Sequence, residues 1–414
     1  SVVSTTSNHS ASSHPAPPAA PSHHGLGTKG VSTFEKVISQ TRPSWLPPKP
    51  REEDQVHYSQ WSEMMDKSRE HDKERRKLAE ARRMEKEKRL AILTPDWEKL
   101  LGDGFTVAKV QSDVKLRRMW FEGIPSHLRG KAWALCIGNP LALSKDAYKS
   151  YVARSRRAIT SGRFPVGVLD QIETDLDDTL VTLKVFGRGS PMRDDVKELL
   201  HAWMVARSDE GLGYAKNITQ IAAMLLLSTS PAQAFLSLQN LLSRPVLRAF
   251  YTDTEDEIEA YYRVFENLQA DAYPKIYATC KSVGLRVPEE WWRSLLVQQV
   301  SFEGVCRLWD QIVLDGDGYL FRAALAIFGF LEPRLYYPDR EELLSTLEGR
   351  NPASLAIIAR EKERARLKGE PWSEGVDGKL SVFGLDEERL FERLEEDGWR
   401  ESRYERLVQR ELPY

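Results

Sequence analysis

The sequence predicts an all-α protein, and three features support that prediction. Apolar side chains recur at helical spacing over residues 218–227, a run that begins in a glycine-rich loop. A long stretch at 55–92 is dense in charged residues that favour helices, with charges three and four positions apart. Two further helical pieces at 116–135 are separated by a glycine-proline break. We therefore expect helices joined by turns.

Composition argues against a globally basic nucleic-acid-binding surface, a cysteine metal site and a membrane-spanning segment. The 414 residues are 41% apolar and 29% charged, which is typical of a protein with a sizeable core, and the formal net charge is only −2. A globally basic surface for nucleic acid is thus not expected. Cys136, Cys280 and Cys306 lie far apart without metal-ligand spacing, so we expect reduced core cysteines and neither a metal nor a cofactor. No apolar run is long enough to cross a bilayer, and we expect a cytoplasmic protein.

Two segments precede the expected globular region. Residues 1–54 are rich in Ser, Pro and His, a composition that predicts a disordered tail. Residues 55–92 predict a charged helix with too few apolar residues for a coiled-coil seam. A solvated spacer, contact of 67–90 with an anionic membrane or acidic partner, and RNA binding remain alternatives for this helix.

A compact region is expected from residue 93 to about 340, and it opens with a distinctive motif. Glycine and proline in 123–125 relax and then fix the backbone at the start of a new helix. The segment resembles the first signature of TBC domains, the two-lobed all-helical fold of Rab GTPase-activating proteins, G-I-P-x-x-x-R-G-x-x-W. The matching residues are Gly123, Ile124, Pro125, Arg129, Gly130 and Trp133.

Further TBC-like motifs follow in the family's order. Residues 172–179 resemble I-x-x-D-x-x-R-T, 213–217 resemble G-Y-x-Q-G, and 306–325 resemble the late signature of an R-x-W-D helix followed by an acidic glycine turn. The resemblance assigns GTPase-binding or signature roles to Arg129, Trp133, Asp175, Tyr214, Trp309 and Asp310.

Three further segments carry smaller expectations. Residues 136–139 are similar to a TBC subgroup linked to recycling endosomes and autophagy. The stretch 292–300 is shorter than the family pattern, which predicts a trimmed helix. Residues 341–414 predict a helical extension with amphipathic helices at 355–367 and 385–407.

The resemblance also implies a mechanism from which this chain departs. TBC domains insert an arginine and a glutamine beside the GTP of a Rab protein, which itself carries the nucleotide and Mg²⁺. Asp178 stands in the arginine position, Lys216 in the glutamine position, and Asn217 replaces the following glycine. A carboxylate cannot neutralise phosphoryl charge, and lysine lacks the carbonyl that would orient water.

Two arrangements of the altered residues are open. Asp178 and Lys216 have opposite charges and would be neighbours, so they could form an ion pair that closes the old cleft. Alternatively, each side chain points to solvent.

Three functions follow from these observations. The first is a catalytically degenerate TBC protein that binds a Rab as a trafficking scaffold, peripheral on endosomal or Golgi membranes, with no small-molecule substrate. The second is an active GTPase activator that uses a displaced arginine, Arg188 or Arg193, or relies on the GTPase's own glutamine. The third is an adaptor that binds no GTPase.

Overall fold

The computed structural model describes residues 51–102, 104–368 and 378–412. The chain divides into two units, Ser1–Lys86 and Glu87–Tyr414. Most of the expected tail, residues 1–50, lies outside the described residues, and residues 51–54 already belong to a helix.

The first unit contains most of helix α2, which runs from Arg51 to Leu100. Exposed ion pairs one turn apart join Lys67 to Glu63, at 2.7 Å, and Arg69 to Asp66, at 2.6 Å. Most of the described side chains before residue 90 are exposed to solvent. Such pairs add only a few tenths of a kcal/mol each to a helix, about 0.2–0.5.

The charged helix is longer than the sequence predicts, because α2 continues past Ile92 and through Pro95 to Leu100. Its last turn carries Trp97, which is fully buried in a small core cluster with Trp120 and Leu314. The indole rings of Trp97 and Trp120 lie 5.2 Å apart. Burial of these aromatic side chains offsets the cost of a proline inside the helix, about 3 kcal/mol.

The second unit continues with helices in close succession. The first group is α3 (Val107–Ser112), α4 (Val114–Glu122), α5 (Ser126–Ile137), α6 (Ala147–Thr160), α7 (Val166–Asp177), η1 (Val181–Leu183), α8 (Pro191–Asp209), α9 (Ile218–Ser228) and α10 (Pro231–Leu242). The next group is α11 (Pro245–Thr252), α12 (Glu255–Ala272), α13 (Pro274–Ser282), α14 (Glu289–Arg293), α15 (Phe302–Asp315), α16 (Asp317–Phe330) and η2 (Glu332–Arg334). The last group is α17 (Arg340–Leu347), α18 (Pro352–Lys368), η3 (Lys379–Phe383), α19 (Glu387–Glu396) and α20 (Glu401–Glu411).

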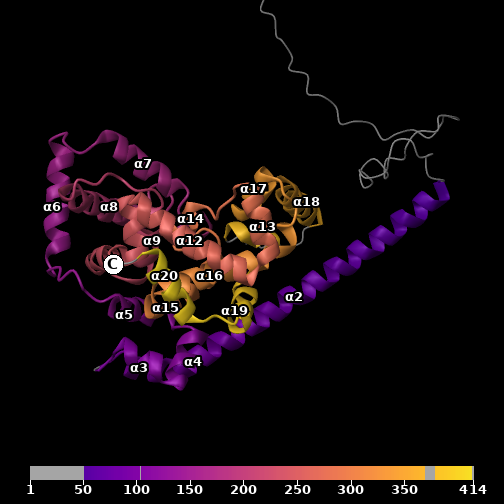
Figure 1. Cartoon of the computed structure of the whole chain (residues 1–414), viewed down its shortest axis with the longest axis horizontal. Coiled ribbons are helices and arrows are strands. Elements are labelled where there is room, and N and C mark those ends of the chain that lie inside the picture. The colour runs from indigo at the N-terminus through magenta and orange to yellow at the C-terminus, as the bar shows by residue number, and fades with distance from the viewer. Residues whose placement is uncertain (1–50, 103, 369–377, 413–414) are drawn as a thin grey trace, which may run out of the picture. The chain divides into compact units, whose positions relative to one another are not determined.

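Helix contacts within this unit fall into two groups, as a two-lobed domain requires. Helices α5 to α10 pack mainly on one another, and α11 to α16 pack together with α19 and α20 (Figure 1). Helix α15 links the groups, because it contacts α4 and α5 as well as α16 and α19. The described residues contain helices and turns but no strand, which confirms the predicted all-α class.

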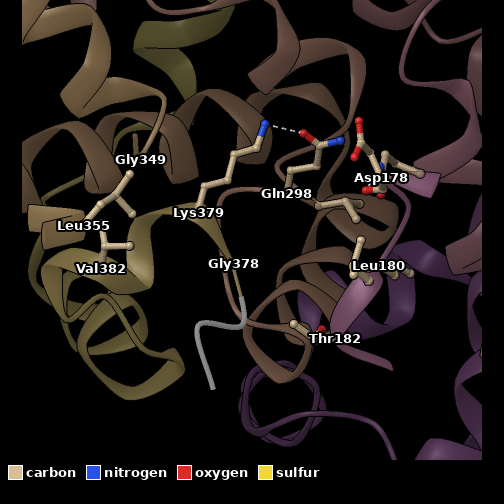
Figure 2. Close-up of a pocket in the computed structure, with 12 residues that line it drawn as sticks. Asp178, Leu180, Thr182, Gln298, Gly349, Leu355, Gly378, Lys379 and Val382 are labelled. Carbon is tan, nitrogen blue, oxygen red and sulfur yellow. Dashed lines mark hydrogen bonds between the residues drawn. The ribbon is translucent and has the colours of Figure 1, made fainter. Parts of the chain in front are cut away.

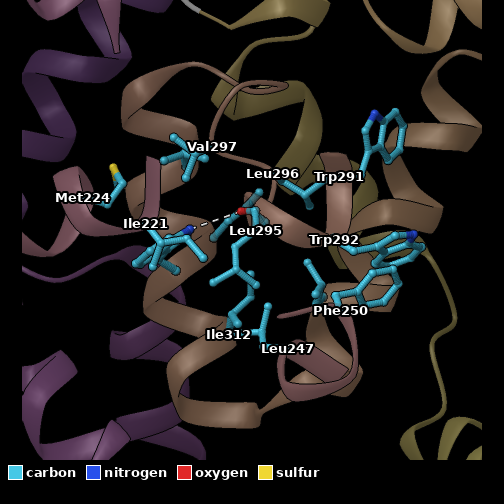
Figure 3. Packing of buried hydrophobic residues seen from close by; sticks show 14 of the residues in the cluster. Ile221, Met224, Leu247, Phe250, Trp291, Trp292, Leu295, Leu296, Val297 and Ile312 are labelled. Carbon is cyan, nitrogen blue, oxygen red and sulfur yellow. Dashed lines mark hydrogen bonds between the residues drawn. The ribbon is translucent and has the colours of Figure 1, made fainter. Parts of the chain in front are cut away.

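Helix α9 lies in the main core, as the apolar run at 218–227 predicts. Every residue from Ile218 to Leu226 is buried, and a helix that is apolar on all sides must be enclosed by neighbours. Figure 3 shows Ile221 and Met224 of α9 near Leu295 and Val297, with Trp292 and Phe250 farther along the same cluster.

One close contact explains the glycine of the first motif. A Cβ atom built on Gly130 of α5 would lie 1.9 Å from the backbone carbonyl oxygen of Ser228, at the end of α9. Only glycine lets the two helices approach so closely.

The stretch at 292–300, where we predict a trimmed helix, follows a short helix. Helix α14 has five residues, and Leu295 and Leu296 after it adopt left-handed backbone angles, with φ of 49° and 63°. The cysteines are also free of disulfides, and burial raises the pKa of the Cys280 thiol to about 11. Reduced, inert core cysteines fit this environment.

The C-terminal extension packs on the second helix group. Arg322 of α16 pairs with Asp397 at 2.6 Å, and the ring of Phe321 lies 5.0 Å from that of Tyr404. The single helix predicted at 385–407 is wrong: it is two helices, α19 and α20, because Gly398 adopts φ of 61° between them. Throughout the described residues, each helix is too short or too polar to span a lipid bilayer.

Candidate functional site

The first motif, at 123–133, and the late motif, at 306–325, meet at the buried carboxylate of Asp310. Asp310 of α15 is fully buried and accepts hydrogen bonds from the backbone N–H of Ile124 at 3.2 Å, Arg129 Nε at 3.1 Å and Trp133 Nε1 at 2.8 Å. Its backbone carbonyl accepts from Trp120 Nε1 at 2.6 Å. Burial alone lowers the pKa of Arg129, but nearby negative charge, chiefly Asp310, raises it overall.

Trp309 completes this cluster. Its ring lies 5.3 Å from that of Trp133, and its Nε1 donates to the carbonyl of Leu295 at 3.2 Å, beside the left-handed turn after α14. Trp133, Trp309 and Asp310 are fully buried, so they cannot touch a partner in this structure. Together with Arg129 they join segments about 180 residues apart, as the spacing of 181 between Arg129 and Asp310 shows, which is a structural role for these signature residues.

A second set of hydrogen bonds joins the motif at 172–179 to the motif at 213–217. The hydroxyl of Tyr214 donates to Asp175 Oδ2 at 2.7 Å, and Gln171 donates to the other carboxylate oxygen at 2.6 Å. Burial, and then the hydrogen bond to Asp175, raise the pKa of Tyr214, so its hydroxyl keeps its proton and remains the donor. This bond clamps the loop before α9 to helix α7.

Asp178 lies three residues after Asp175, and its side chain is exposed. It is the C-cap of α7, directly after the last helical residue Asp177. Its backbone carbonyl accepts a hydrogen bond from Gln220 Nε2 of α9 at 3.2 Å. Leu180 follows in a left-handed conformation, with φ of 41°, and such strained residues gather at functional sites.

Asn217 keeps the backbone geometry that a glycine would supply. Its φ is 66°, in the left-handed region that glycine adopts freely and that asparagine tolerates best among other residues. Lys216, one residue earlier, has an exposed side chain. The loop thus has the backbone conformation that the glycine of the motif would allow.

The ion pair considered between Asp178 and Lys216 is absent. Both residues are described, and no nitrogen of Lys216 lies within 4.0 Å of a carboxylate oxygen of Asp178. Both side chains are exposed, which matches the alternative in which each points to solvent. Water competes well for two exposed charges, and such a pair contributes little to stability.

The two displaced-arginine candidates differ sharply. Arg193 is buried and bonds Glu173 at 2.7 Å and Asp177 at 2.9 Å, so it cannot reach a partner. Arg188 pairs with Asp177 at 2.6 Å, yet 80% of its side chain is exposed. Of the two, only Arg188 has a side chain that is open to solvent.

A cavity of about 430 Å³ opens beside Asp178 (Figure 2). Figure 2 shows Gln298 between Lys379 and Asp178, and Lys379 donates to Gln298 Oε1 at 2.6 Å. Gln220 also lines the cavity, and its amide oxygen is buried without a hydrogen-bond partner. Sequence reasoning missed Gln220, although a single amide within an apolar helix was a visible signal.

Comparison with known proteins places the chain in a family. Residues 126–336, just over half of the chain, match the model of the Rab-GTPase-TBC domain. The fold is similar to the crystal structure of the Chlamydomonas flagellar RabGAP TBC domain, with a TM-score of 0.51 and 18% identity over 75% of this chain and 94% of that one.

Curated relatives carry the same domain name. The chain is 28% identical to mouse (Mus musculus) TBC1 domain family member 14 over 371 residues, covering 82% of this chain and 52% of the relative. It is 29% identical to a TBC domain-containing protein of Schizosaccharomyces pombe, covering 77% and 70%. The chain thus spans about half the length of the first of these relatives. These matches, with the buried signature cluster, show that the chain belongs to the Rab-GTPase-TBC domain family.

Proposed function

We propose that this protein binds a Rab-family GTPase in membrane traffic and does not stimulate GTP hydrolysis by the two-residue mechanism of its family. One observation carries the proposal. The motif backbone is retained, through the Tyr214–Asp175 bond and the left-handed Asn217, but Asp178 and Lys216 occupy the positions of the two catalytic side chains.

The chemistry of these two replacements opposes catalysis. An arginine finger accelerates hydrolysis by roughly a thousand- to a hundred-thousandfold because it neutralises charge on the transferring phosphoryl group. A carboxylate at Asp178 adds repulsion instead, worth about 1 kcal/mol or more at a few ångströms even when well screened. Lys216 carries charge but cannot accept a proton from the attacking water.

The proposed division of the chain follows the same logic. Residues 93–340 form the TBC domain, and 341–414 form an annex packed on it through contacts such as Arg322–Asp397. The Rab partner supplies GTP and Mg²⁺, so the chain itself requires no cofactor. We place the protein in the cytoplasm, peripheral on endosomal or Golgi membranes.

Single-turnover GTP hydrolysis over a panel of Rab proteins tests the proposal. The wild type is compared with the triple variant Asp178→Arg, Lys216→Gln, Asn217→Gly, and binding to GTP-loaded and GDP-loaded Rabs is measured in parallel. We expect binding without acceleration by the wild type, and acceleration by the triple variant with the Rab that binds.

Each contrary outcome has a clear meaning. Acceleration by the wild type would refute the degenerate mechanism. Absence of binding to every Rab, with a normally folded protein, would instead support an adaptor that uses the fold for other contacts.

A second candidate function, an activator with a displaced arginine, rests on the exposed side chain of Arg188 beside Asp177. Its test is Arg188→Ala in the same hydrolysis assay. If the wild type accelerates hydrolysis and this variant loses the effect, while Rab binding is kept, Arg188 acts as the arginine finger.

A further inference from the structure

Four arginines line one hollow at the C-terminal end of α6, away from the candidate GTPase site. Helix α6 lies at the outer edge of the first helix group (Figure 1). The hollow has a volume of about 640 Å³ and is lined by Arg154, Arg156, Arg157, Ala158, Thr160, Ser161 and Arg163.

Two of these arginines are neutralised and two are not. Arg154 forms a bidentate pair with Asp209, both distances being 2.7 Å, and Arg156 pairs with Glu198. Arg157 donates only to the backbone carbonyl of Ala153, at 3.2 Å. The guanidinium of Arg163 has no hydrogen bond or ion pair within the described part of the chain. The hollow therefore has an excess of two positive charges.

The backbone beneath these arginines is firmly held. The N–H groups of Arg163 and Phe164 both donate to the carbonyl of Ala158, at 2.9 and 3.1 Å, and Gly162 supplies the positive φ of 67° that the turn requires. Phe164 is buried, with its ring 5.4 Å from that of His201. Arg163 thus stands on a fixed turn.

The helix dipole explains the position of only one of the two unpaired arginines. Cations in the last turn stabilise the negative end of the helix dipole, which explains Arg157. Arg163 lies beyond the helix end, and its side chain forms no ion pair with the described residues. Like charges gathered without partners repel one another, so an external anion would stabilise the arrangement.

The chemistry of the hollow points to a phosphate-bearing surface. Guanidinium groups present planar pairs of N–H donors that match phosphate oxygens. Val166, three residues after Arg163 in the chain, is an apolar residue that is 69% exposed. Basic and apolar side chains together suit the headgroup region of a membrane. We propose that the arginine hollow at the end of α6 binds the phosphate headgroups of anionic lipids.

Vesicle co-sedimentation with the full chain tests this proposal. Vesicles contain phosphatidylcholine alone, or with phosphatidylserine, or with phosphatidylinositol phosphates. The variant Arg157→Ala/Arg163→Ala should bind the anionic vesicles about 25-fold more weakly, since each basic residue near such a surface contributes about fivefold. Binding of the wild type should fall as salt is raised.

A matched control removes the same charge elsewhere. Arg340 and Arg360 are exposed, and Arg360, like Arg157, donates only to a backbone carbonyl. The variant Arg340→Ala/Arg360→Ala should retain binding within a few-fold of the wild type. The basic residues of α2 are unchanged in every variant, so any contribution from that helix cancels.

Three outcomes would overturn the proposal. These are equal losses in the two double variants, no loss in the α6 variant, or a selective loss of single-stranded RNA binding with vesicle binding intact. If the α6 variant folds poorly by circular dichroism, Arg157→Lys/Arg163→Lys keeps the charge. That variant should retain vesicle binding to within a few-fold, and a full loss would count against the electrostatic basis of the site.

Discussion

Removal of the Asp310 carboxylate should destabilise the second unit more than any exposed change. In Asp310→Ala, the guanidinium of Arg129 loses its counter-charge, and the N–H groups of Ile124 and Trp133 lose their acceptor. Breaking a buried ion pair from one side costs about 3–5 kcal/mol, because the remaining charge stays buried. We expect the free energy of unfolding to fall by that amount.

Urea unfolding followed by tryptophan fluorescence measures this loss. The control is Asp146→Ala, since Asp146 is exposed and its side chain makes no capping hydrogen bond. That change should lie within about 0.5 kcal/mol of the wild type. Asp310→Asn should be intermediate, because it keeps one acceptor oxygen but loses the charge.

A double variant separates the two costs. If the unpaired charge dominates, Arg129→Met/Asp310→Ala should be less destabilised than the sum of its single variants. The reasoning would be refuted if Asp310→Ala cost less than about 1 kcal/mol, a loss that a single neutral hydrogen bond explains.

Two other predictions concern packing and thiol chemistry. Gly130→Ala should lower the free energy of unfolding in urea by about 1–3 kcal/mol, because the added Cβ meets a backbone carbonyl at the end of α9. In the control Gly167→Ala, in α7, the added Cβ meets no atom within 4 Å, so this change should be neutral or stabilising. Equal effects of the two variants would contradict the close packing of α5 and α9. At pH 8, the Cys280 thiol, with a pKa of about 11 instead of the usual 9.0, should react with a thiol reagent about 100-fold more slowly than in the unfolded chain. Its rate should rise with pH toward 11, and stability should fall above about pH 9 because the unfolded thiol releases its proton first; a native rate equal to the unfolded rate would contradict burial.

Much of the fold was predictable because local patterns dominate helices. The apolar run in α9 and the break at 123–125 need only spacing and backbone preferences. Helix ends were less predictable: α2 passes through Pro95 because Trp97 has a core to enter, and residues 385–407 divide at Gly398.

The candidate site shows the same division. Asp178, Lys216 and Asn217 could be identified from their places in the motifs, and the left-handed backbone of Asn217 agrees with the glycine that it replaces. Burial could not be predicted. The role of Asp310 depends on the packing of α15 against α5, where Trp133 donates to its carboxylate. The position of Gln220 depends on the packing of α9 against α7, where it donates to the backbone carbonyl of Asp178.

The sequence by itself determined the helical class, the family and the departure of Asp178 and Lys216 from two of the TBC motifs, because these depend on residue identity and local spacing. Only the tertiary structure decided that Asp178 and Lys216 do not pair, that Arg193 is buried while Arg188 is exposed, and that four arginines share a hollow. Those outcomes depend on contacts between helices that are distant in the chain. Local preferences do not distinguish between the alternative side-chain positions, so packing and solvation decide which one is adopted.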